Sequence, residues 1–186
     1  MVQHDKGSEA ETLPRPGSAL YNLNHPDEKI KEKTLKKYKR VNKFLVLPLY
    51  RLKILPLLGF GRVFLILITK GRISGKKRRT PLEYHRIEGI ITIFSGRGED
   101  SGWMKNIRAA SESVWVKHGF HSFHAKVDFI QDESEKLKIV KWYVNNHSKS
   151  AKMLFGWNPK KDNPEITDFS EFLKMISIIR LIPKEN

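Results

Sequence analysis

Short runs of β-branched and aromatic residues, several of them joined by tight turns, recur along the chain after residue 61. Arg79–Ile87 and Ile90–Ser95 are separated only by Glu88-Gly89, and a two-residue connection that ends in glycine is typical of a β-hairpin. Ser113–Lys117 and Phe120–Ile130 repeat the arrangement around a second glycine-containing turn. Strands joined by so few residues run antiparallel, because a parallel pair needs a crossover of about a dozen residues or more.

Two further strands and several helices complete the pattern. The apolar run Val63–Thr69 predicts a buried strand, and SIIRLI at Ser177–Ile182 predicts the last one. Four helices are expected between the strands. Asp100 or Ser101 can cap a helix that runs to Ala110, and Asp132 with Glu135 begins a helix through Val144. A third helix, Ser148–Phe155, ends at Gly156, and Asp168 with Glu171 begins a fourth at Phe172–Met175. The expected fold class is mainly β with helices (α+β): a small antiparallel barrel with external helices, not a doubly wound sheet.

We expect three regions along the chain. Residues 1–25 are polar and contain several prolines and glycines, which predicts a flexible polar arm. Residues 26–47 predict a basic amphipathic helix, and residues 48–186 the barrel domain. The charged face of that helix is either solvated or a docking surface for a membrane or a partner. Its apolar positions are Ile30, Leu35, Tyr38, Val41 and Leu45.

The charge of the chain points to an anionic partner. Lys and Arg number 35 against 20 Asp and Glu, a formal net charge of +15. That balance suits nucleic acid, an acidic membrane surface or a phosphorylated small molecule. Nucleic acid is the least expected of these, since no recognised motif interleaves the basic residues with exposed aromatics.

The chain has no cysteine, which excludes disulfides, thiolate nucleophiles and cysteine metal sites. Charges and prolines interrupt the most apolar stretch, Phe44–Ile68, so we expect no membrane-spanning helix. No apolar signal segment is visible in the first twenty residues. We therefore expect a cytoplasmic protein.

The most basic segment, TKGRISGKKRRTP at Thr69–Pro81, connects two predicted strands. This position excludes a P-loop or a dinucleotide fingerprint, because both open a helix. Gly71 and Gly75 would let the backbone approach a ligand, and arginine side chains grip phosphate or carboxylate with two hydrogen bonds. Alternation along the following strand would turn Arg79 away from Arg78. The segment is either an anion site or a solvated basic loop.

A second candidate segment, SGRGEDSGWMKN at Ser95–Asn106, joins a strand to a helix start through a glycine-rich turn. Exposed amides in such a turn can hold an anion or a carbonyl oxygen. Trp103 and Asn106 are three residues apart and share one helix face, although Trp103 would equally suit the core.

Little in the sequence predicts acid–base chemistry. His121 and His124 face opposite sides of a strand, so no metal site is expected among the histidines. Neither a nucleophile triad nor a pair of carboxylates stands out. This pattern fits an enzyme whose cofactor does the chemistry.

These segments together resemble a known family. GRISGKKRRTPLEY at Gly71–Tyr84 resembles the GRxSGxxRxxPL signature of the deazaflavin (coenzyme F-420)-dependent nitroreductase family. SGRG followed by Trp103-x-x-Asn106 is similar to the next motif of that family, and IIRLIP to its terminal strand. The matches keep their order over residues 44 to 183.

The resemblance implies a split β-barrel, of the flavin-reductase and FMN-binding kind, that binds the polyanionic deazaflavin coenzyme F-420. It implies hydride transfer from the reduced coenzyme to an electrophilic small molecule: a quinone, an activated alkene or a nitro compound. The basic loop would grip the phosphodiester and the glutamate tail, and the glycine turn would border the ring. The implied cofactor-binding residues are Arg72, Ser74, Gly75, Lys76, Lys77, Arg78, Thr80, Pro81, Ser95, Gly96, Arg97, Trp103 and Asn106, of which Lys76 and Lys77 are additional charges of this chain.

The chain departs from the family in two places. Ile73 replaces a basic residue often seen there, and the tyrosines that line the substrate side of some members are not evident. The candidates for that side are Tyr84, Trp157, Phe169 and Phe172. No catalytic residue is assigned, and the proton donor is Tyr84, a histidine or water.

Several alternatives stay open at this point. Related split barrels bind flavin mononucleotide (FMN) or haem. A basic, non-enzymatic binder of anionic membrane or nucleic acid would also explain the charge. We expect a monomer or homodimer that acts on a small molecule, with peripheral contact to an anionic membrane as a further role.

Overall fold

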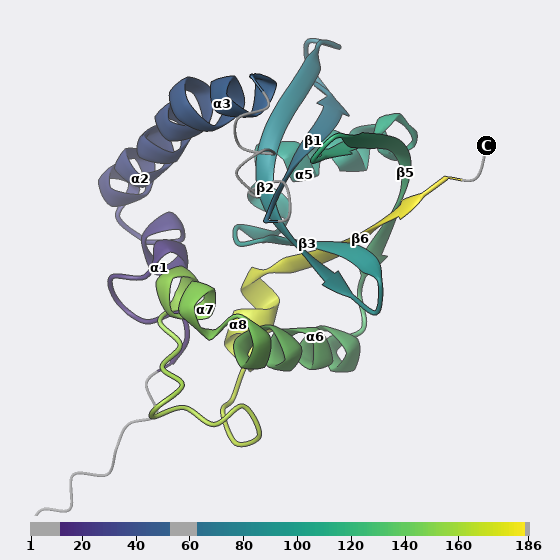
Figure 1. The fold of residues 1–186 in the computed structure, drawn as a ribbon. Helices are drawn as coiled ribbons and strands as arrows, with labels where there is room; N and C mark the ends of the chain where they lie inside the picture. Colours follow the sequence, from purple (N-terminus) through teal and green to yellow (C-terminus); the bar gives the residue numbers. More distant parts are fainter. Residues whose placement is uncertain (1–11, 53–62, 185–186) are drawn as a thin grey trace, which may run out of the picture.

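The computed structural model describes residues 12–52 and 63–184, within which six antiparallel strands close into a barrel (Figure 1). The order around the barrel is β1-β2-β3-β6-β5-β4, and β1 also pairs with β4. The predicted fold class, an antiparallel split barrel with external helices, is confirmed. The strands are β1 Phe64–Lys70, β2 Lys77–Ile87, β3 Ile90–Ser95, β4 Trp115–His118, β5 His121–Ile130 and β6 Ser177–Pro183.

Alternate side chains of the strands fill the barrel. Leu65, Leu67 and Ile93 are fully buried there. Helix α5 (Gly102–Ala109) adds Met104 and Ile107 to the same core, and it packs beside β1. Helix α5 is thereby fixed next to β1, which leads into the connection between β1 and β2.

A second apolar core lies between the outside of the barrel and three helices, α6 (Glu133–Asn146), α7 (Ser148–Phe155) and α8 (Ser170–Met175). Figure 1 shows these helices gathered on one side of the barrel, next to α1. Asp132 caps α6 by accepting a hydrogen bond from the Glu135 amide at 2.7 Å. Gly156 ends α7 with a φ of +85°. Both signals were read correctly from the sequence.

The structure corrects the predicted flexible arm for residues 12–25. Leu13 and Leu20 are buried in the second core, and α1 (Ala19–Leu23) packs against α7. Arg15 donates to both carboxylate oxygens of Asp162, at 2.6 and 2.8 Å. The polar composition of the segment gave no sign that two of its leucines are buried. The ion pair was not predictable either, because Asp162 lies far from Arg15 in the sequence. The first eleven residues of the predicted arm lie outside the described residues.

The predicted basic helix is longer than expected. It comprises α2 (Glu28–Val41), a π-helical turn (Asn42–Val46) and α3 (Leu47–Arg51). Asp27 caps α2 by accepting a hydrogen bond from the Lys29 amide at 2.8 Å. Pro48 does not end the helix. It follows directly on the π-helical turn, where the backbone hydrogen-bond pattern already departs from that of an α-helix. Among the described residues, no helix has the length and apolar character needed to span a bilayer.

Candidate functional site

The basic loop between β1 and β2 is a compact turn. Its ends are set by the strand pairs Thr69–Arg78 and Lys70–Lys77. The Gly71 amide donates to the Lys76 carbonyl at 2.9 Å, and the Gly75 amide donates to the Gly71 carbonyl at 2.7 Å. Gly75 has a φ of +64°, a left-handed conformation that favours glycine. The backbone of the loop is hydrogen-bonded to itself, and residues 72 to 79 are all exposed.

Asn106 ties this loop to α5. Its side-chain oxygen accepts hydrogen bonds from the Arg72 amide at 3.2 Å and from the Arg72 guanidinium at 3.5 Å. Its side-chain nitrogen donates to the Thr69 hydroxyl at 3.3 Å. Asn106 is almost completely buried, and its amide therefore fixes both the backbone of the loop and the direction of one arginine.

Gly71 forms the floor of a cradle within the loop. A Cβ atom at this position would lie 3.0 Å from the Ser74 hydroxyl and 3.2 Å from Nε of Arg78. The Arg78 guanidinium also donates to the Ser74 hydroxyl at 3.2 Å. The Lys76 carbonyl oxygen lies 3.1 Å from the same point, so a side chain on Gly71 would displace its neighbours. Hydroxyl and guanidinium groups such as those of Ser74 and Arg78 are donors that bind oxyanions.

Within the part of the chain that the structure describes, the cations of the loop have no acidic partner. Throughout residues 12–52 and 63–184, every ion pair within 4.0 Å uses basic residues outside residues 70–79. Unpaired, exposed arginines and lysines on one loop leave a positive potential for an external anion. The loop therefore offers its cations to an external anion.

The glycine turn after β3 is held from two directions. The Ser95 hydroxyl donates to the Gly98 carbonyl at 2.7 Å and lies 2.7 Å from the Ser101 hydroxyl. Asn24, just after α1, donates its side-chain amide to the Gly96 carbonyl at 2.9 Å. A Cβ on Gly96 would come within 2.1 Å of the Leu20 side chain. The turn admits only glycine there, because α1 packs directly on it.

The other predicted cofactor residues line the same two segments. Thr80 and Pro81 lie on β2 opposite Leu67 and Ile66. Trp103 is half-buried against the core of the barrel. The structure joins Arg72 with Asn106 and Ser74 with Arg78, and it places Ser95 and Gly96 in a separate, rigid turn.

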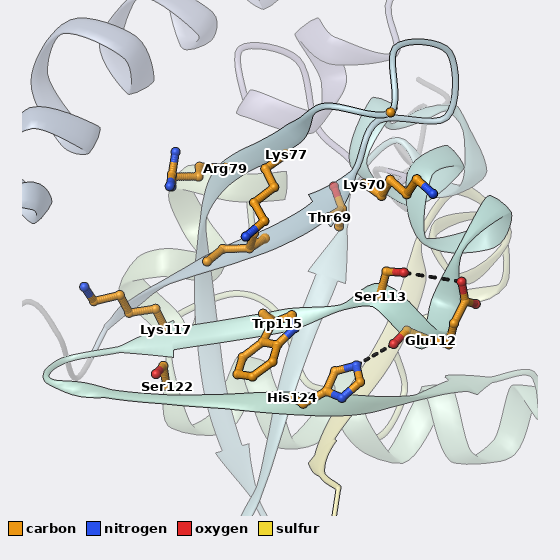
Figure 2. A pocket seen from close by; sticks show the side chains of 12 residues that line it. Thr69, Lys70, Lys77, Arg79, Glu112, Ser113, Trp115, Lys117, Ser122 and His124 are labelled. Carbon is orange, nitrogen blue, oxygen red and sulfur yellow. Dashed lines mark hydrogen bonds between the residues drawn. The ribbon is translucent and has the colours of Figure 1, made fainter.

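The outer face of the barrel carries a groove of about 660 Å³ that sequence reasoning missed (Figure 2). Lys70, Lys77, Arg79 and Lys117 line it, and Trp115 stacks on His124 with ring centroids 5.1 Å apart. Of the predicted cofactor residues, only Gly75 and Lys77 border this groove. Strand alternation, which turned Arg79 away from Arg78, was the signal that could have found it. The loop therefore divides its cations between two faces.

The predicted substrate side needs correction, since its four residues do not share a pocket. Tyr84 lies inside the barrel core, because even-numbered residues of β2 point inward. Trp157, Phe169 and Phe172 belong to the second core, where Trp157 stacks on Phe169 with centroids 5.7 Å apart. Among these four, Phe172 alone lines a cavity found in the described residues.

That cavity, of about 120 Å³, lies between β2, β3 and the second-core helices. His85 lines it and is 6% exposed, with its Nε2 3.6 Å from a carboxylate oxygen of Glu83. Burial, and to a lesser degree the nearby His147, lowers the pKa of His85 to about 4. Burial also raises the pKa of the Glu83 carboxyl and that of the Tyr143 hydroxyl. No group of three or more potential metal ligands occurs in the described chain.

Comparison with protein families identifies the class. The model of the F420H(2)-dependent quinone reductase family matches residues 57–152, about half of the chain. The chain belongs to this family, which confirms the resemblance to F-420-dependent split-barrel oxidoreductases. It is therefore a member of a family of coenzyme F-420-dependent reductases. Comparison with curated proteins finds no match.

Three solved structures illustrate the similarity. An F420-H2 dependent reductase (FDR-A) is 21% identical, with 64% of this chain and 94% of that chain covered and a TM-score of 0.43. A conserved hypothetical protein from Mycobacterium tuberculosis is 17% identical, with 66% and 74% covered and a TM-score of 0.45. A FAD-binding protein from Mesorhizobium loti is 15% identical, with 66% and 82% covered and a TM-score of 0.43.

Replacing Asn106 should loosen the basic loop. In Asn106→Ala the Arg72 amide and the Thr69 hydroxyl lose their partner, and trypsin should cut at the basic residues of the loop severalfold faster than in the wild type. Asn106→Asp keeps the acceptor oxygen and should stay close to the wild-type rate. Cleavage within α2, measured by mass spectrometry in the same digests, is the internal control. Equal loop cleavage in Asn106→Ala and wild type would contradict the role of this amide.

His85 should make folding stability depend on pH. Its pKa is lower in the folded chain, so its contribution to stability is complete above the unfolded value of 6.5 and is lost as the pH falls toward 4. Between about pH 7.5 and about pH 5, the free energy of unfolding should drop by about 2 kcal/mol more in the wild type than in His85→Gln. Urea titrations at both pH values measure this free energy. His121→Gln, which replaces an exposed imidazole on β5, is the control. Equal decreases in the free energy of unfolding for wild type and His85→Gln would refute the prediction.

Proposed function

We propose that this protein is an F-420-dependent oxidoreductase that reduces an electrophilic small molecule. Quinones are the first candidates, because the family is that of the F420H(2)-dependent quinone reductases. The observation that carries this proposal is the hydrogen bonding of Asn106, which ties the basic loop to α5. Through it, the two segments that resemble the family's cofactor motifs lie side by side. Activated alkenes and nitro compounds remain further substrate candidates.

The grip on the anionic part of the coenzyme falls to the basic loop. Arg72 and Arg78 would bind phosphodiester or carboxylate oxygens with two hydrogen bonds each. The Ser74 hydroxyl adds a neutral donor at the Gly71 cradle. Lys76 and Lys77 are exposed and would add point charges for the glutamate tail. Gly75 would keep the loop in the conformation that this grip requires.

The ring of the coenzyme would lie along the glycine turn. Ser95, Gly96 and Arg97 would border the deazaflavin and its ribityl chain, with Trp103 on the flank. Thr80 and Pro81 would contribute backbone next to the grip. The coenzyme, when bound, supplies a hydride, while the protein orients the reactants and excludes water. The Ser95 hydrogen bonds hold the turn rigid before any ligand arrives.

We further propose that the helix formed by α2, the π-helical turn and α3 rests on an anionic membrane surface. Phe44, Leu45 and Leu52 have exposed fractions of 70%, 55% and 68%, next to the many lysines of α2. Large apolar side chains flanked by lysines are typical of helices that lie in a membrane interface. Such contact would bring a cytoplasmic enzyme, monomeric or homodimeric, to lipid-soluble quinones.

Removal of one arginine should weaken coenzyme binding. The wild type should bind oxidised coenzyme F-420 with micromolar or tighter affinity, measured by quenching of coenzyme fluorescence. Arg78→Ala should bind about tenfold or more weakly, since a charge-assisted contact is lost. Arg86→Ala is the matched control: it lies on the same strand but beyond the loop, where it donates to the Gly89 carbonyl, and it should bind like the wild type.

Other outcomes of that titration discriminate between the alternatives. Absence of quenching with the wild type would overturn the enzyme assignment and leave the non-enzymatic anion binder. Binding of FMN but not of the deazaflavin would place the protein among the flavin-binding split barrels. Equal affinities for Arg78→Ala and Arg86→Ala would remove the basic loop from the site.

Vesicle binding tests the membrane proposal. The wild type should co-sediment with vesicles that contain anionic lipid and should do so less at high salt, because screening weakens the lysine contribution. A variant with Phe44→Ser and Leu45→Ser should lose most of this binding. Ile166→Ser, which removes an apolar side chain with 83% exposure elsewhere on the surface, should leave it unchanged. Vesicle binding that changes neither with salt concentration nor with the double substitution would contradict the proposal.

A further inference from the structure

The cavity between β2, β3 and the helices of the second core has one polar end. Glu83 and His85 project there from β2, and Tyr143 joins them from α6. The His85 ring lies 4.9 Å from that of Tyr143 and 4.4 Å from that of His147. No hydrogen bond to the buried Tyr143 hydroxyl occurs among the described residues. The core helices thus enclose a connected group of polar side chains that the proposed grip on the coenzyme does not use.

The rest of the cavity wall is apolar. Three phenylalanines line it together with aliphatic side chains: Phe94, Phe155 and Phe172 with Leu20, Val140, Leu154 and Ile176. Apolar walls that include aromatic rings can bind a planar ring by stacking and edge contacts. A cavity of roughly 150 Å³ holds one benzene molecule. This cavity, of about 120 Å³, is slightly smaller, so one ring would fill it and two fused rings would not fit.

Two further features connect the cavity to the proposed coenzyme site. Gly96, at the turn assigned to the deazaflavin ring, also lines the cavity. Leu20 lines the cavity next to Gly96. It packs so closely on Gly96 that a Cβ atom on that residue would not fit. A ring in the cavity would therefore lie next to the turn, and Leu20 would limit its size.

We propose that this cavity binds the ring of the electrophilic substrate, a single uncharged ring with a carbonyl oxygen as in a quinone. His85 hydrogen-bonds that oxygen, and the Glu83–His85 pair supplies its proton. The inference rests on the proposed function and names the substrate subsite that the proposed function leaves open.

The reaction balances with the groups present. Reduction of a quinone to a hydroquinone takes up one hydride, which carries the electron pair, and one proton. The hydride comes from the reduced coenzyme, which is thereby oxidised. The hydride forms a new O–H bond at one carbonyl oxygen of the quinone, whose C=O π bond breaks as electrons shift through the ring. The proton adds to the other carbonyl oxygen, the one that His85 hydrogen-bonds, as its C=O π bond breaks and the second O–H bond forms. The side chain of Glu83 is one-third exposed, so the pair regains its proton from water.

The protonation state of His85 suits this role. With its pKa lowered by burial, the imidazole is neutral near pH 7 and offers an N–H to a carbonyl oxygen without carrying a charge into the cavity. The raised pKa of Glu83 keeps a proton available at a higher pH than an ordinary carboxyl would.

Binding without coenzyme tests the subsite independently of turnover. The probe is 4-pyranone, an unreactive planar six-membered ring with one carbonyl oxygen, titrated into the ¹⁵N-labelled full chain. Amide shifts should concentrate on Phe94, Gly96 and Tyr143. His85→Phe should weaken binding about tenfold through the lost hydrogen bond, whereas His85→Gln, which keeps a donor, should bind within about twofold of the wild type. Dispersed amide spectra verify that each variant is folded.

The role of Leu20 supplies a second, opposite effect. Chromone, the two-ring analogue of 4-pyranone, should bind the wild type barely, whereas Leu20→Ala should bind it at least about tenfold better, because the lost side chain enlarges the cavity.

With reduced coenzyme and a single-ring quinone, His85→Gln should keep its KM within about twofold but lose about tenfold or more in kcat, since glutamine cannot pass a proton.

The outcomes separate this proposal from the proposed function. Shifts scattered away from the cavity, or equal 4-pyranone affinity in His85→Phe and wild type, would overturn the substrate subsite even where coenzyme binds normally. A wild type that binds 4-pyranone in the cavity but no coenzyme would instead overturn the proposed function. Unchanged chromone binding in Leu20→Ala would refute the limit that Leu20 sets on ring size.

Discussion

Strand β1 pairs with β2 along one edge and with β4 along the other, and this closure determines where every functional side chain lies. The register sets Thr69 opposite Arg78 and Lys70 opposite Lys77, so the connecting loop is short and its backbone hydrogen-bonds to itself. α5 fills one part of the barrel interior, and Asn106 on α5 then reaches Thr69 and Arg72. Without closure, neither the direction of Arg72 nor the position of the loop would be fixed.

Strand alternation has a second consequence. Neighbouring cations on β2 point to opposite faces, which divides the charge of the loop between the grip built on Arg72, Ser74 and Arg78 and the outer groove with Trp115. The outside of the barrel at β2 is covered further along by the second core, where His85 is buried beside the partly exposed Glu83. One strand thus carries the proposed anion grip at its start and the proposed substrate subsite near its middle.

Much of the fold was predictable because its signals are local. Hairpin turns, capping residues such as Asp132, and the glycine that ends α7 depend only on neighbouring residues. The packing of residues 12–25 was not predictable in this way, since Arg15 pairs with Asp162 and Leu20 packs on Gly96, contacts that span most of the chain. Tyr84 was assigned to the substrate side although the alternation of β2 turns it into the barrel. His85 was overlooked because a single histidine in a strand gives no sign of what covers it.

The central claim is that the basic loop and the glycine turn hold the coenzyme together. Hydrogen exchange of the full chain with and without oxidised coenzyme F-420 tests it most directly. The account predicts slower exchange in peptides that cover Gly71–Pro81 and Ser95–Asn106, with β4 and β5 unchanged. Protection confined to Trp115–His124, with none in Ser95–Asn106, would place the coenzyme in the outer groove and contradict the account.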